Sequence, residues 1–364
     1  MSTSSSGLAG TPSALPLPAS GGLTWRPWTR EDAPALAGLM RTIEQADGRD
    51  WFTSADEIDD LFDAPVFEPA ADTQVGLGAD GAMLAYARIE RFPTDGVDLV
   101  RVFLSGGVHP TRRGEGIGTD LLGWATARAR QTLAEVRSEP LLRDLPARIS
   151  AHIEDSDPAE RRELLLAGGL EPARYFANLR RDLSAPLPAV GLEPPLRLVP
   201  WSEDLDDAAR LARNDSFRDL WGSQPRTAES WRAYRSAFAP EWSFLVVDDS
   251  VHYEGSDLER PGDESVPPGT PYVVGLHMAG RYEHDWESQG FRAGDTDLLG
   301  VRRAYRGRRI GAALLAHAMR RFADDGMEVA VLDVDTDNPT GAPALYAGLG
   351  YTKNDGSTMY AVEI

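Results

Sequence analysis

The chain has 364 residues, no cysteine, and 57 acidic against 37 basic side chains, so its formal net charge is −20. At roughly 100–200 residues per domain, this length predicts two domains. The lack of cysteine excludes disulfides, thiolate metal sites and a cysteine nucleophile. The acidic balance argues against nucleic-acid binding, which normally requires a basic patch. It suits a cationic acceptor, although solubility alone explains it as well.

The N-terminal segment 1–22 is rich in Ser, Gly, Pro and Ala. It lacks the basic region and the continuous apolar region of a signal peptide. No apolar run in the chain approaches the ~18 residues of a membrane-spanning helix. We therefore expect a disordered tail over 1–22 and a cytoplasmic protein without membrane partners.

An internal repeat organises the rest of the chain. Residues 23–32 (LTWRPWTRED) resemble residues 196–204 (LRLVPWSED), and residues 108–118 (VHPTRRGEGIG) resemble residues 301–311 (VRRAYRGRRIG). A repeat of this length indicates duplicated domains rather than a solenoid. Four prolines between the copies are typical of a linker. The sequence thus predicts an N-terminal domain, a linker and a C-terminal domain, over residues 23–183, 184–195 and 196–364.

The two copies predict the same order of elements. In the first copy a hairpin turn at 78–81 precedes the repeated motif, a strand over 148–153 and a closing strand over 175–179. In the second copy the hairpin loop is long, over 248–271. Apolar periodicity predicts further elements there, namely strands 243–247, 272–278, 296–301, 329–334 and 359–364 and helices 310–323 and 343–349. This order predicts an α/β fold of two tandem domains, each a mixed, mostly antiparallel sheet with helices on both faces.

The motif repeated at 108–118 and 301–311 carries the chemistry. In each copy a strand ends in Val, and five residues later Arg-Gly-x-x-Ile-Gly opens a helix. A glycine-containing turn at a helix N-terminus exposes backbone N–H groups that hold phosphate oxygens, and glycine lets the backbone approach them closely. The motif lacks the Gly-Lys-Ser/Thr ending of a Walker A loop and the Gly-x-Gly-x-x-Gly of a dinucleotide site.

The pattern Val-x-x-x-x-Arg-Gly-x-Gly-Ile-Gly resembles the acetyl-CoA pyrophosphate loop of the GNAT superfamily of N-acetyltransferases. Residues 108–118 match it fully, and residues 301–311 match it except that Arg309 replaces the central glycine. The second signature of the family is an Asn, a helix with Leu-Tyr, and then Gly-aromatic, to which residues 338–351 (NPTGAPALYAGLGY) are similar. The tandem layout resembles that of the mycothiol synthase-like acetyltransferases of actinobacteria.

The resemblance implies that acetyl-CoA is the cosubstrate and that both loops bind it, without a metal. The six histidines show no metal-ligand spacing. The implied binding residues of the first copy are Val108, Arg113, Gly114, Glu115, Gly116, Ile117 and Gly118. Those of the second copy are Leu299, Val301, Arg306, Gly307, Arg308, Arg309, Ile310, Gly311 and Asn338.

The proton-transfer residues favour the second copy as the catalytic one. The family's usual acid, a helix tyrosine that protonates the departing thiolate, matches Tyr346, whereas the first copy has Leu165 there. Four residues before the Val that ends the strand, the second copy has Asp297 as a candidate base and the first copy has Leu104. Arg309 departs from the loop pattern in the second copy, but proton-transfer groups are harder to replace than one loop N–H.

Each assignment has a structural alternative. Tyr346 could be a packing residue of an amphipathic helix, and Asp297 could be a solvated strand residue. The loop before that strand offers further candidate bases, which are Glu283, His284, Asp285 and Glu287. Trp221 and Trp231 lie where the family usually forms its acceptor mouth, with an aromatic core as the alternative.

The sequence predicts an acetyl-CoA-dependent N-acetyltransferase that acts on a primary amine of a small molecule, with no nucleic-acid partner. The alternatives are a mycothiol synthase proper, a non-catalytic acyl-CoA-binding or sensing protein, and transfer to a protein amine. Tyr346 and Asn338 at the family spacing argue against a pure binder. The loops at 248–271 and 281–295 argue against a protein acceptor, because they would crowd the acceptor mouth. No residue pattern indicates the acceptor's identity or an oligomeric state.

Overall fold

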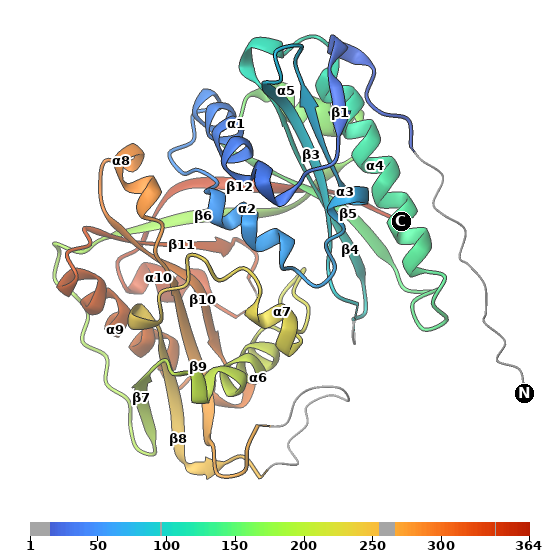
Figure 1. The fold of residues 1–364 in the computed structure, drawn as a ribbon. Helices are drawn as coiled ribbons and strands as arrows, with labels where there is room; N and C mark the ends of the chain where they lie inside the picture. Colours follow the sequence, from blue (N-terminus) through green and yellow to red (C-terminus); the bar gives the residue numbers. More distant parts are fainter. Residues whose placement is uncertain (1–14, 95–96, 255–265, 339) are drawn as a thin grey trace, which may run out of the picture.

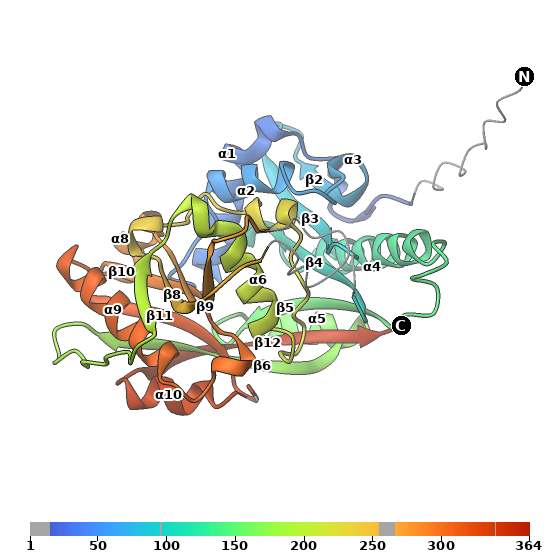
Figure 2. The ribbon, with the colours of Figure 1, turned by 90° about the horizontal axis from the view of Figure 1, so that it is seen from below.

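A computed structural model describes residues 15–94, 97–254, 266–338 and 340–364 (Figure 1). The strands of these residues form one continuous 12-stranded sheet in the order β1-β2-β3-β4-β5-β12-β6-β11-β10-β9-β8-β7. The two copies of the repeat, called here the N-terminal and C-terminal halves, lie toward opposite ends of this sheet (Figures 1 and 2). Neighbouring strands are antiparallel except β4 with β5 and β10 with β11, which are parallel.

The N-terminal half runs from β1 to β6. Its strands are β1 (Thr24–Arg26), β2 (Thr73–Leu77), β3 (Met83–Arg91), β4 (Val100–Val108), β5 (Ala147–Glu154) and β6 (Glu171–Asp182). Its helices are α1 (Ala33–Ala46), α2 (Ala55–Phe62), α3 (Pro69–Asp72), α4 (Ile117–Val136) and α5 (Ala159–Ala167). Short 3-10 turns are η1 (Ser20–Gly22), η2 (Arg30–Asp32) and η3 (Pro110–Arg112).

The C-terminal half runs from β7 to β12. Its strands are β7 (Leu196–Pro200), β8 (Phe244–His252), β9 (Pro271–Gly280), β10 (Ala293–Val301), β11 (Val329–Asp335) and β12 (Thr352–Glu363). Its helices are α6 (Asp206–Ser216), α7 (Ala228–Arg232), α8 (Trp286–Gln289), α9 (Ile310–Asp324) and α10 (Ala342–Gly348). The 3-10 turns are η4 (Glu203–Leu205), η5 (Pro240–Trp242), η6 (Glu283–Asp285) and η7 (Arg303–Tyr305).

Helices cover both faces of the sheet in each half. Successive side chains of a strand point to opposite faces, and along β3 Ala85 and Ala87 pack in the core beneath α4. Between them, Tyr86 packs in the core beneath α1 and α2. In the same way Val246 of β8 faces the core beneath α9 and α10, and Val247 faces the core beneath α6. The predicted fold class is confirmed, and the predicted strands and helices are present with shifted ends. Residues 255–265 of the predicted hairpin loop at 248–271 lie outside the described residues.

The closing strands of the two halves are exchanged. β6, which ends the N-terminal half in sequence, pairs with β11 of the C-terminal half. β12, at the end of the chain, pairs with β5 of the N-terminal half. The two exchanged strands pair with each other in the middle of the sheet. The expectation that each half closes its own sheet is therefore wrong, and Tyr360 of β12 lies in the N-terminal core while Leu179 of β6 lies in the C-terminal core.

The predicted linker lies between the two halves in sequence, directly after the exchanged strand β6. Residues 184–195 contain no helix or strand. The division of the chain into domains at this segment stays a prediction, since strands from both sides of it complete each half.

Part of the N-terminal tail packs against the protein. Of the segment 1–22 that we expected to be disordered, residues 1–14 lie outside the described residues. The backbone N–H groups of Ala19 and Ser20 donate to the carboxylate of Asp120, in the first turn of α4, at 3.0 and 2.8 Å. Arg112 donates to the carbonyl oxygen of Gly21 at 2.6 Å. Residues 19–21 therefore contact a carboxylate on α4 and the guanidinium of Arg112 in η3, while disorder over 1–22 as a whole stays a prediction.

The exchange predicts that a core variant in one closing strand destabilises the half to which it does not belong in sequence. Tyr360→Ala removes a buried ring from the N-terminal core and should cost about 3–5 kcal/mol. Hydrogen exchange should then show loss of protection first in β4 and β5. The matched variant Leu179→Ala should cost about 2–5 kcal/mol and expose β10 and β11 first. Protection lost first in the C-terminal half for Tyr360→Ala, or in the N-terminal half for Leu179→Ala, would contradict the exchange.

Candidate functional site

The two parallel strand pairs separate part of the way along their length. Within the described residues, β4 pairs with β5 only as far as Leu104, and β10 pairs with β11 only as far as Thr296. Beyond these points β4 and β10 continue to Val108 and Val301, paired with β3 and β9. Each half therefore has a wedge between two strands, and its phosphate loop follows directly at the end of one of them.

Both phosphate loops have the same backbone conformation. Gly114 and Gly116 have φ angles of +81° and +83°, and Gly307 and Arg309 have φ angles of +79° and +60°. Arg309 thus adopts the left-handed conformation of the glycine that it replaces, which costs a residue with a side chain roughly 1–2 kcal/mol. α4 and α9 begin directly after these residues without a side-chain cap. Their first backbone N–H groups are therefore available to a phosphate.

The arginine side chains of the loops bind carboxylates of the protein itself. Arg113 lies 2.8 Å from the buried carboxylate of Asp47, and Arg306 lies 3.3 Å from the exposed carboxylate of Asp219. The other loop residues at the helix starts are exposed, apart from the buried Ile117 and Ile310, and they are Gly114, Glu115, Gly116, Gly307, Arg308 and Arg309. The loops therefore present backbone N–H groups, rather than the guanidinium groups of Arg113 and Arg306, to a phosphate.

A cavity of about 1190 Å³, called here the first-loop cavity, opens at the first phosphate loop. It is lined by the part of β4 that does not pair with β5, by the loop and by the end of β5, including Gly106, Arg112 and Glu154. Ligand pockets usually measure ~300–1,000 Å³, so this cavity can take an elongated ligand that reaches from the loop into the wedge. Tyr282 and Arg226 of the C-terminal half form part of its far wall.

Among the carboxyl groups that line the first-loop cavity, the sequence analysis missed two with raised pKa values. Burial raises the pKa of Glu154 to about 7, against the opposing effect of Arg49. Burial also raises the pKa of Glu44 on α1, which accepts hydrogen bonds from the backbone and hydroxyl of Thr53. Leu165, at the position of the family's acid, lines the same cavity. The one signal for Glu154 in the sequence is an acidic residue that directly follows a buried apolar strand.

Asp297 lies where β10 and β11 separate. β10 pairs with β9 at Thr296 and next at Leu298, so Asp297 is the extra residue of a β-bulge, and bulges are common next to active sites because they re-aim a side chain. The Asp297 side chain is exposed by its surface area, although protein atoms crowd around its carboxyl group. The partial loss of water that this crowding causes, with nearby Glu57 and Asp333, raises the pKa of Asp297 to about 7.

Asp297 is linked to the first-loop cavity by one hydrogen bond. The hydroxyl of Tyr282 donates to its carboxylate at 3.3 Å, and Tyr282 is part of the cavity wall. Burial also raises the pKa of the neighbouring Asp295, and the charge of Asp297 raises it further. The predicted base thus sits in a group of carboxylates that faces the boundary between the halves.

Tyr346 on α10 is 7% exposed and packs in the C-terminal core. Its ring meets that of Tyr351 edge to face, with 5.9 Å between the centroids. Burial raises the pKa of Tyr346 to about 12, so its hydroxyl is protonated at neutral pH and can donate a proton. The packing interpretation and the acid interpretation are therefore compatible, and the catalytic roles of Tyr346 and Asp297 stay predictions.

The packing of the last helix confirms which residues of the two copies are equivalent. A Cβ atom placed on Gly311 in the first turn of α9 would lie 3.4 Å from Leu345, and one on Gly118 in α4 would lie 3.5 Å from Leu164. The next residue in each case is the family's acid position. Tyr346 and Leu165 therefore occupy the same place in the two halves, as counting along the sequence predicted.

The other predicted contacts of the second copy have local structural roles. The side-chain oxygen of Asn338 accepts hydrogen bonds from the backbone and hydroxyl of Thr340, at 2.9 and 2.6 Å, and holds the turn before α10. Leu299 and Val301 belong to the part of β10 that borders the wedge, and they pack partly buried on the C-terminal core. Contacts of these residues with acetyl-CoA stay predictions.

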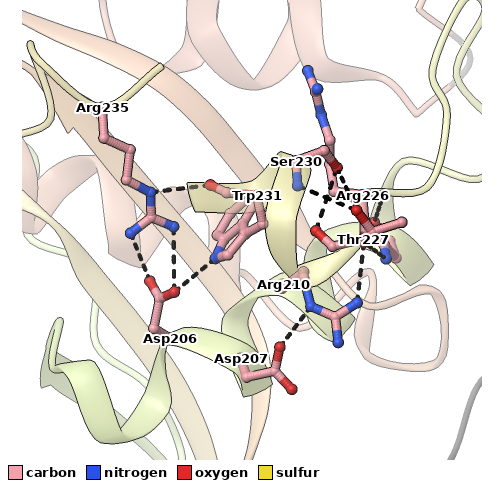
Figure 3. Close-up of polar contacts among 9 residues, drawn as sticks. Asp206, Asp207, Arg210, Arg226, Thr227, Ser230, Trp231 and Arg235 are labelled. Carbon is pink, nitrogen blue, oxygen red and sulfur yellow. Dashed lines mark hydrogen bonds and ion pairs between the residues drawn. The ribbon is translucent and has the colours of Figure 1, made fainter. Parts of the chain in front are cut away.

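The two tryptophans predicted at the acceptor mouth have different surroundings. The indole N–H of Trp231 donates to Asp206 at 3.0 Å, and Arg235 binds the same carboxylate at 2.9 Å (Figure 3). Trp231 is 6% exposed, which confirms the core alternative. Trp221 instead lies between the halves, with its ring centroid 4.2 Å from the guanidinium of Arg148.

Two of the alternative bases join the halves. His284 lies with Nε2 2.8 Å from the carbonyl oxygen of Phe52, and Asp285 accepts from the backbone N–H of the same residue at 2.8 Å. Burial raises the pKa of Asp285 to about 6, against the opposing effect of His284. Among the described residues, no three His, Asp or Glu side chains are grouped as a metal site requires. None of the helices in this part of the chain is both long and apolar enough to span a membrane.

Comparisons with known proteins agree with the fold and the loops. Residues 231–351 match the model of the Acetyltransferase (GNAT) family. The chain is 30% identical to the mycothiol acetyltransferase of Salinispora arenicola over 89% of this chain and 92% of that protein. Its fold is similar to that of a GCN5-related N-acetyltransferase from Sphaerobacter thermophilus, with a TM-score of 0.65, 23% identity and coverage of 96% and 97%. It is also similar to a tandem GNAT protein from the clavulanic acid biosynthesis pathway, with a TM-score of 0.60, 17% identity and coverage of 94% and 98%.

The chain belongs to the acetyltransferase (GNAT) family. It is an N-acetyltransferase in which two GNAT-type halves follow each other in one chain. The predicted resemblance, fold and class of activity are thus confirmed.

The conformation of Arg309 yields a stability prediction. Arg309→Gly should relieve the left-handed strain and raise the free energy of unfolding by up to about 1 kcal/mol. Urea denaturation of the full chain measures this change. The matched control Gly116→Ala places a Cβ atom at the same backbone position of the first loop and should destabilise by about 1–2 kcal/mol. A less stable Arg309→Gly variant would show that the guanidinium contributes more than the strain costs.

Proposed function

We propose that the protein transfers an acetyl group from acetyl-CoA directly to a primary amine of a small molecule, and that the C-terminal half carries the chemistry. The observation that carries this proposal is the position of Asp297, a bulge residue placed at the opening between β10 and β11. The equivalent strand of the N-terminal half pairs with β3 without a bulge and has Leu104 at this point. The family match over 231–351 also covers the C-terminal half alone.

The proposed reaction begins with proton removal from the ammonium group of the acceptor. Asp297, with its pKa near 7, accepts this proton, because only the neutral amine attacks. The surrounding carboxylates, Asp295 and Asp333, favour a cationic acceptor at this place by electrostatic attraction. Nitrogen then forms a bond to the thioester carbonyl carbon, and the carbonyl oxygen becomes an oxyanion.

The remaining steps use the strand and the helix of the same half. Backbone N–H groups of β10 beyond Thr296, which β11 does not pair, can stabilise the oxyanion. When the carbon–sulfur bond breaks, Tyr346 donates its phenolic proton to the departing thiolate. The attacking nitrogen loses its surplus proton, which restores the phenol, so the products are the free thiol of CoA and the neutral acetylated amine. The backbone N–H groups at the start of α9 hold the pyrophosphate throughout.

The N-terminal half is proposed to bind acyl-CoA without turnover. Its loop retains every glycine of the family pattern, and the first-loop cavity extends from this loop into the wedge. The acid position is occupied by Leu165, which cannot donate a proton.

Mycothiol acetylation is the narrower function favoured by the sequence relatives, which carry that name. An acetyl-transfer assay over a panel of small amines, with release of free thiol as the readout, tests both levels of the proposal. The panel includes the des-acetyl form of mycothiol. Turnover with that amine alone supports mycothiol acetylation. Turnover with other amines supports the broader function, and no turnover with any amine contradicts catalysis.

Tyr346→Phe tests the proposed acid. The substitution removes one hydroxyl and keeps the ring, so folding should be nearly unchanged. General acids contribute ~10²–10⁴-fold, and kcat should fall by about this range with little change in acetyl-CoA affinity. A purely structural tyrosine predicts full activity in Tyr346→Phe and loss only in Tyr346→Ala. The control Leu165→Ala should reduce stability and leave the activity of each folded molecule intact.

Asp297→Asn tests the proposed base through two pH profiles. The wild-type kcat/KM should rise as pH increases toward about 7, where Asp297 loses its proton, and the variant should lose this rise. Stability should respond in the opposite direction. The pKa of Asp297 is raised in the folded state from an ordinary value of 3.8 to about 7, so folding loses stability as pH rises between these values.

The stability profile separates a buried carboxyl from a solvated one. Asp297→Asn should raise Tm relative to the wild type at pH 8 and leave it unchanged at pH 4. An equal Tm at both pH values would place Asp297 among ordinary solvated residues and remove it as the base.

A further inference from the structure

Basic side chains gather in a second cavity, of about 600 Å³, between the two halves. It is called here the seam cavity. Its walls include Arg101 of β4, Arg148 of β5, Arg174 of β6, and Arg218, Trp221 and Gln224 from the segment between α6 and α7. Four guanidinium groups in one cavity stand out in a chain whose net charge is −20.

Most of these guanidinium groups have a carboxylate partner in the protein. The pairs are Arg148 with Glu363 at 2.6 Å, Arg174 with Asp335 at 2.8 Å, and Arg218 with Asp215 at 3.4 Å. Another carboxylate on the wall, that of Asp219, binds Arg303 and Arg306, at 3.1 and 3.3 Å, at the second phosphate loop. The charge of the cavity therefore depends on the remaining arginine.

Arg101 has no carboxylate partner among the described residues. Its Nε is buried without a hydrogen-bond partner, and its guanidinium lies against the ring of Phe92, 4.6 Å from the centroid. Asp98 lines the same cavity without forming an ion pair with it. Gly222, with a φ of +70°, brings the backbone close, and a Cβ atom there would lie 3.4 Å from Nη1 of Arg101.

Two further arginines lie behind Arg101 and add to the positive charge. Arg213 donates to the carbonyl oxygen of Gln224, and neither it nor Arg226 forms an ion pair in the described part of the chain. Burial, together with nearby Arg226 and Arg148, lowers the pKa of Arg101 to about 10. Burial, Arg226 and Arg101 lower the pKa of Arg213 to about 9. A buried cation without a partner is costly, so a bound anion would stabilise this group of charges.

The walls of the seam cavity are held in place by the protein itself. The amide of Gln224 donates to the carbonyl oxygen of Leu99 at 2.7 Å, and its side-chain oxygen is buried without a partner. Trp221 is flanked by Arg148 and Arg174, whose guanidinium groups lie 4.2 and 5.7 Å from its ring centroid. A ligand with both acceptor oxygens and an O–H donor would satisfy Arg101 and Gln224 together. Hydrogen phosphate esters and free hydrogen phosphate have both.

We propose that the seam cavity binds a phosphoryl group, held by the guanidinium of Arg101 with Arg148 and Arg218 at its sides and Gln224 accepting a hydrogen bond from the ligand. The phosphoryl group can come from free phosphate or a small phosphorylated metabolite, or from the 3′-phosphate of a CoA molecule at the second phosphate loop, which shares Asp219 with the cavity wall. The proposal concerns binding and does not depend on acetyl transfer.

The test is calorimetric titration of the full-length protein with inorganic phosphate, against chloride at constant ionic strength. The wild type should bind phosphate saturably. Arg101→Gln should weaken binding about tenfold or more, since the variant loses charge-assisted hydrogen bonds to the phosphoryl group. The control Arg197→Gln alters an exposed pair with Asp249 far from the cavity in the fold and should bind as the wild type. Equal phosphate affinity in Arg101→Gln, or no binding beyond that of chloride, overturns the proposal.

Stability without phosphate separates a ligand site from a structural arginine. Removing an unpaired buried charge should keep or raise the Tm of Arg101→Gln in chloride, and phosphate should raise the Tm of the wild type alone. If the Tm of Arg101→Gln is lower than that of the wild type in chloride, and phosphate raises both Tm values equally, Arg101 has a structural role and the proposal is contradicted. If Arg101→Gln does not fold, the exposed Arg218→Gln serves instead, with a several-fold loss of phosphate affinity expected and an unchanged affinity overturning the proposal.

Competition identifies the source of the phosphoryl group. Phosphate that still binds in the presence of saturating CoA indicates a free phosphate or metabolite site. Phosphate displaced by CoA but not by 3′-dephospho-CoA indicates the 3′-phosphate. Both outcomes support a phosphoryl site. Bound phosphate that neither additional phosphate nor CoA displaces would overturn the proposal, because a saturable phosphoryl site exchanges its ligand.

Discussion

The backbone hydrogen bonds of β6 and β12 determine how the two halves are joined. A strand in the middle of a sheet needs partners on both sides, because an unpaired buried N–H or C=O group is costly. β6 finds them in β11 and β12, and β12 finds them in β5 and β6. Each half therefore lacks a central strand until the other half is present. The exchange also hides two strand edges, so that only β1 and β7 remain at the ends of the sheet.

The same junction sets the position of both cavities. The first-loop cavity takes Tyr282 and Arg226 from the C-terminal half into its wall, and the seam cavity takes Arg101 and Arg148 from the N-terminal half. Neither cavity belongs to one repeat alone. Their charges also differ, since carboxylates gather around Asp297 while unpaired guanidinium groups gather around Arg101. A chain of high negative charge thus keeps one local region suited to a cation and another suited to an anion.

Local features of the fold could be predicted from the sequence, and pairing could not. The phosphate loops depend on a short run of residues, and the equivalence of Tyr346 and Leu165 follows from counting within a repeat. The exchange depends on which edge β6 and β12 choose. β5 and β11 present the same backbone groups, and the side chains that pack in the opposite cores, among them Tyr360 of β12 and Leu179 of β6, distinguish them.

Register and distance in the sequence explain the other omissions. The bulge at Asp297 is a property of the pairing of β10 with β9 and leaves no mark on the strand pattern. Arg101, Arg213 and Arg226 come together only because the segment between α6 and α7 lies against the start of β4. The contacts of Ser20 with α4 likewise need a carboxylate, that of Asp120, from far along the chain.

The duplication has led to two halves with the same loop backbone and different chemistry. The N-terminal loop adopts its left-handed turn with Gly116, without strain, and has an apolar residue at the acid position. The C-terminal loop adopts the same turn with Arg309, at an energetic cost, and keeps a tyrosine and a bulge carboxylate beside its wedge. Strain that persists beside proton-transfer groups is typical of functional sites. Because Tyr282 donates to Asp297 and also lines the first-loop cavity, a ligand in the unstrained half would lie beside the tyrosine that is bonded to the proposed base of the strained half. The exchanged strands hold this arrangement in one register, so the first-loop cavity of one half and the proposed base of the other are joined through one tyrosine.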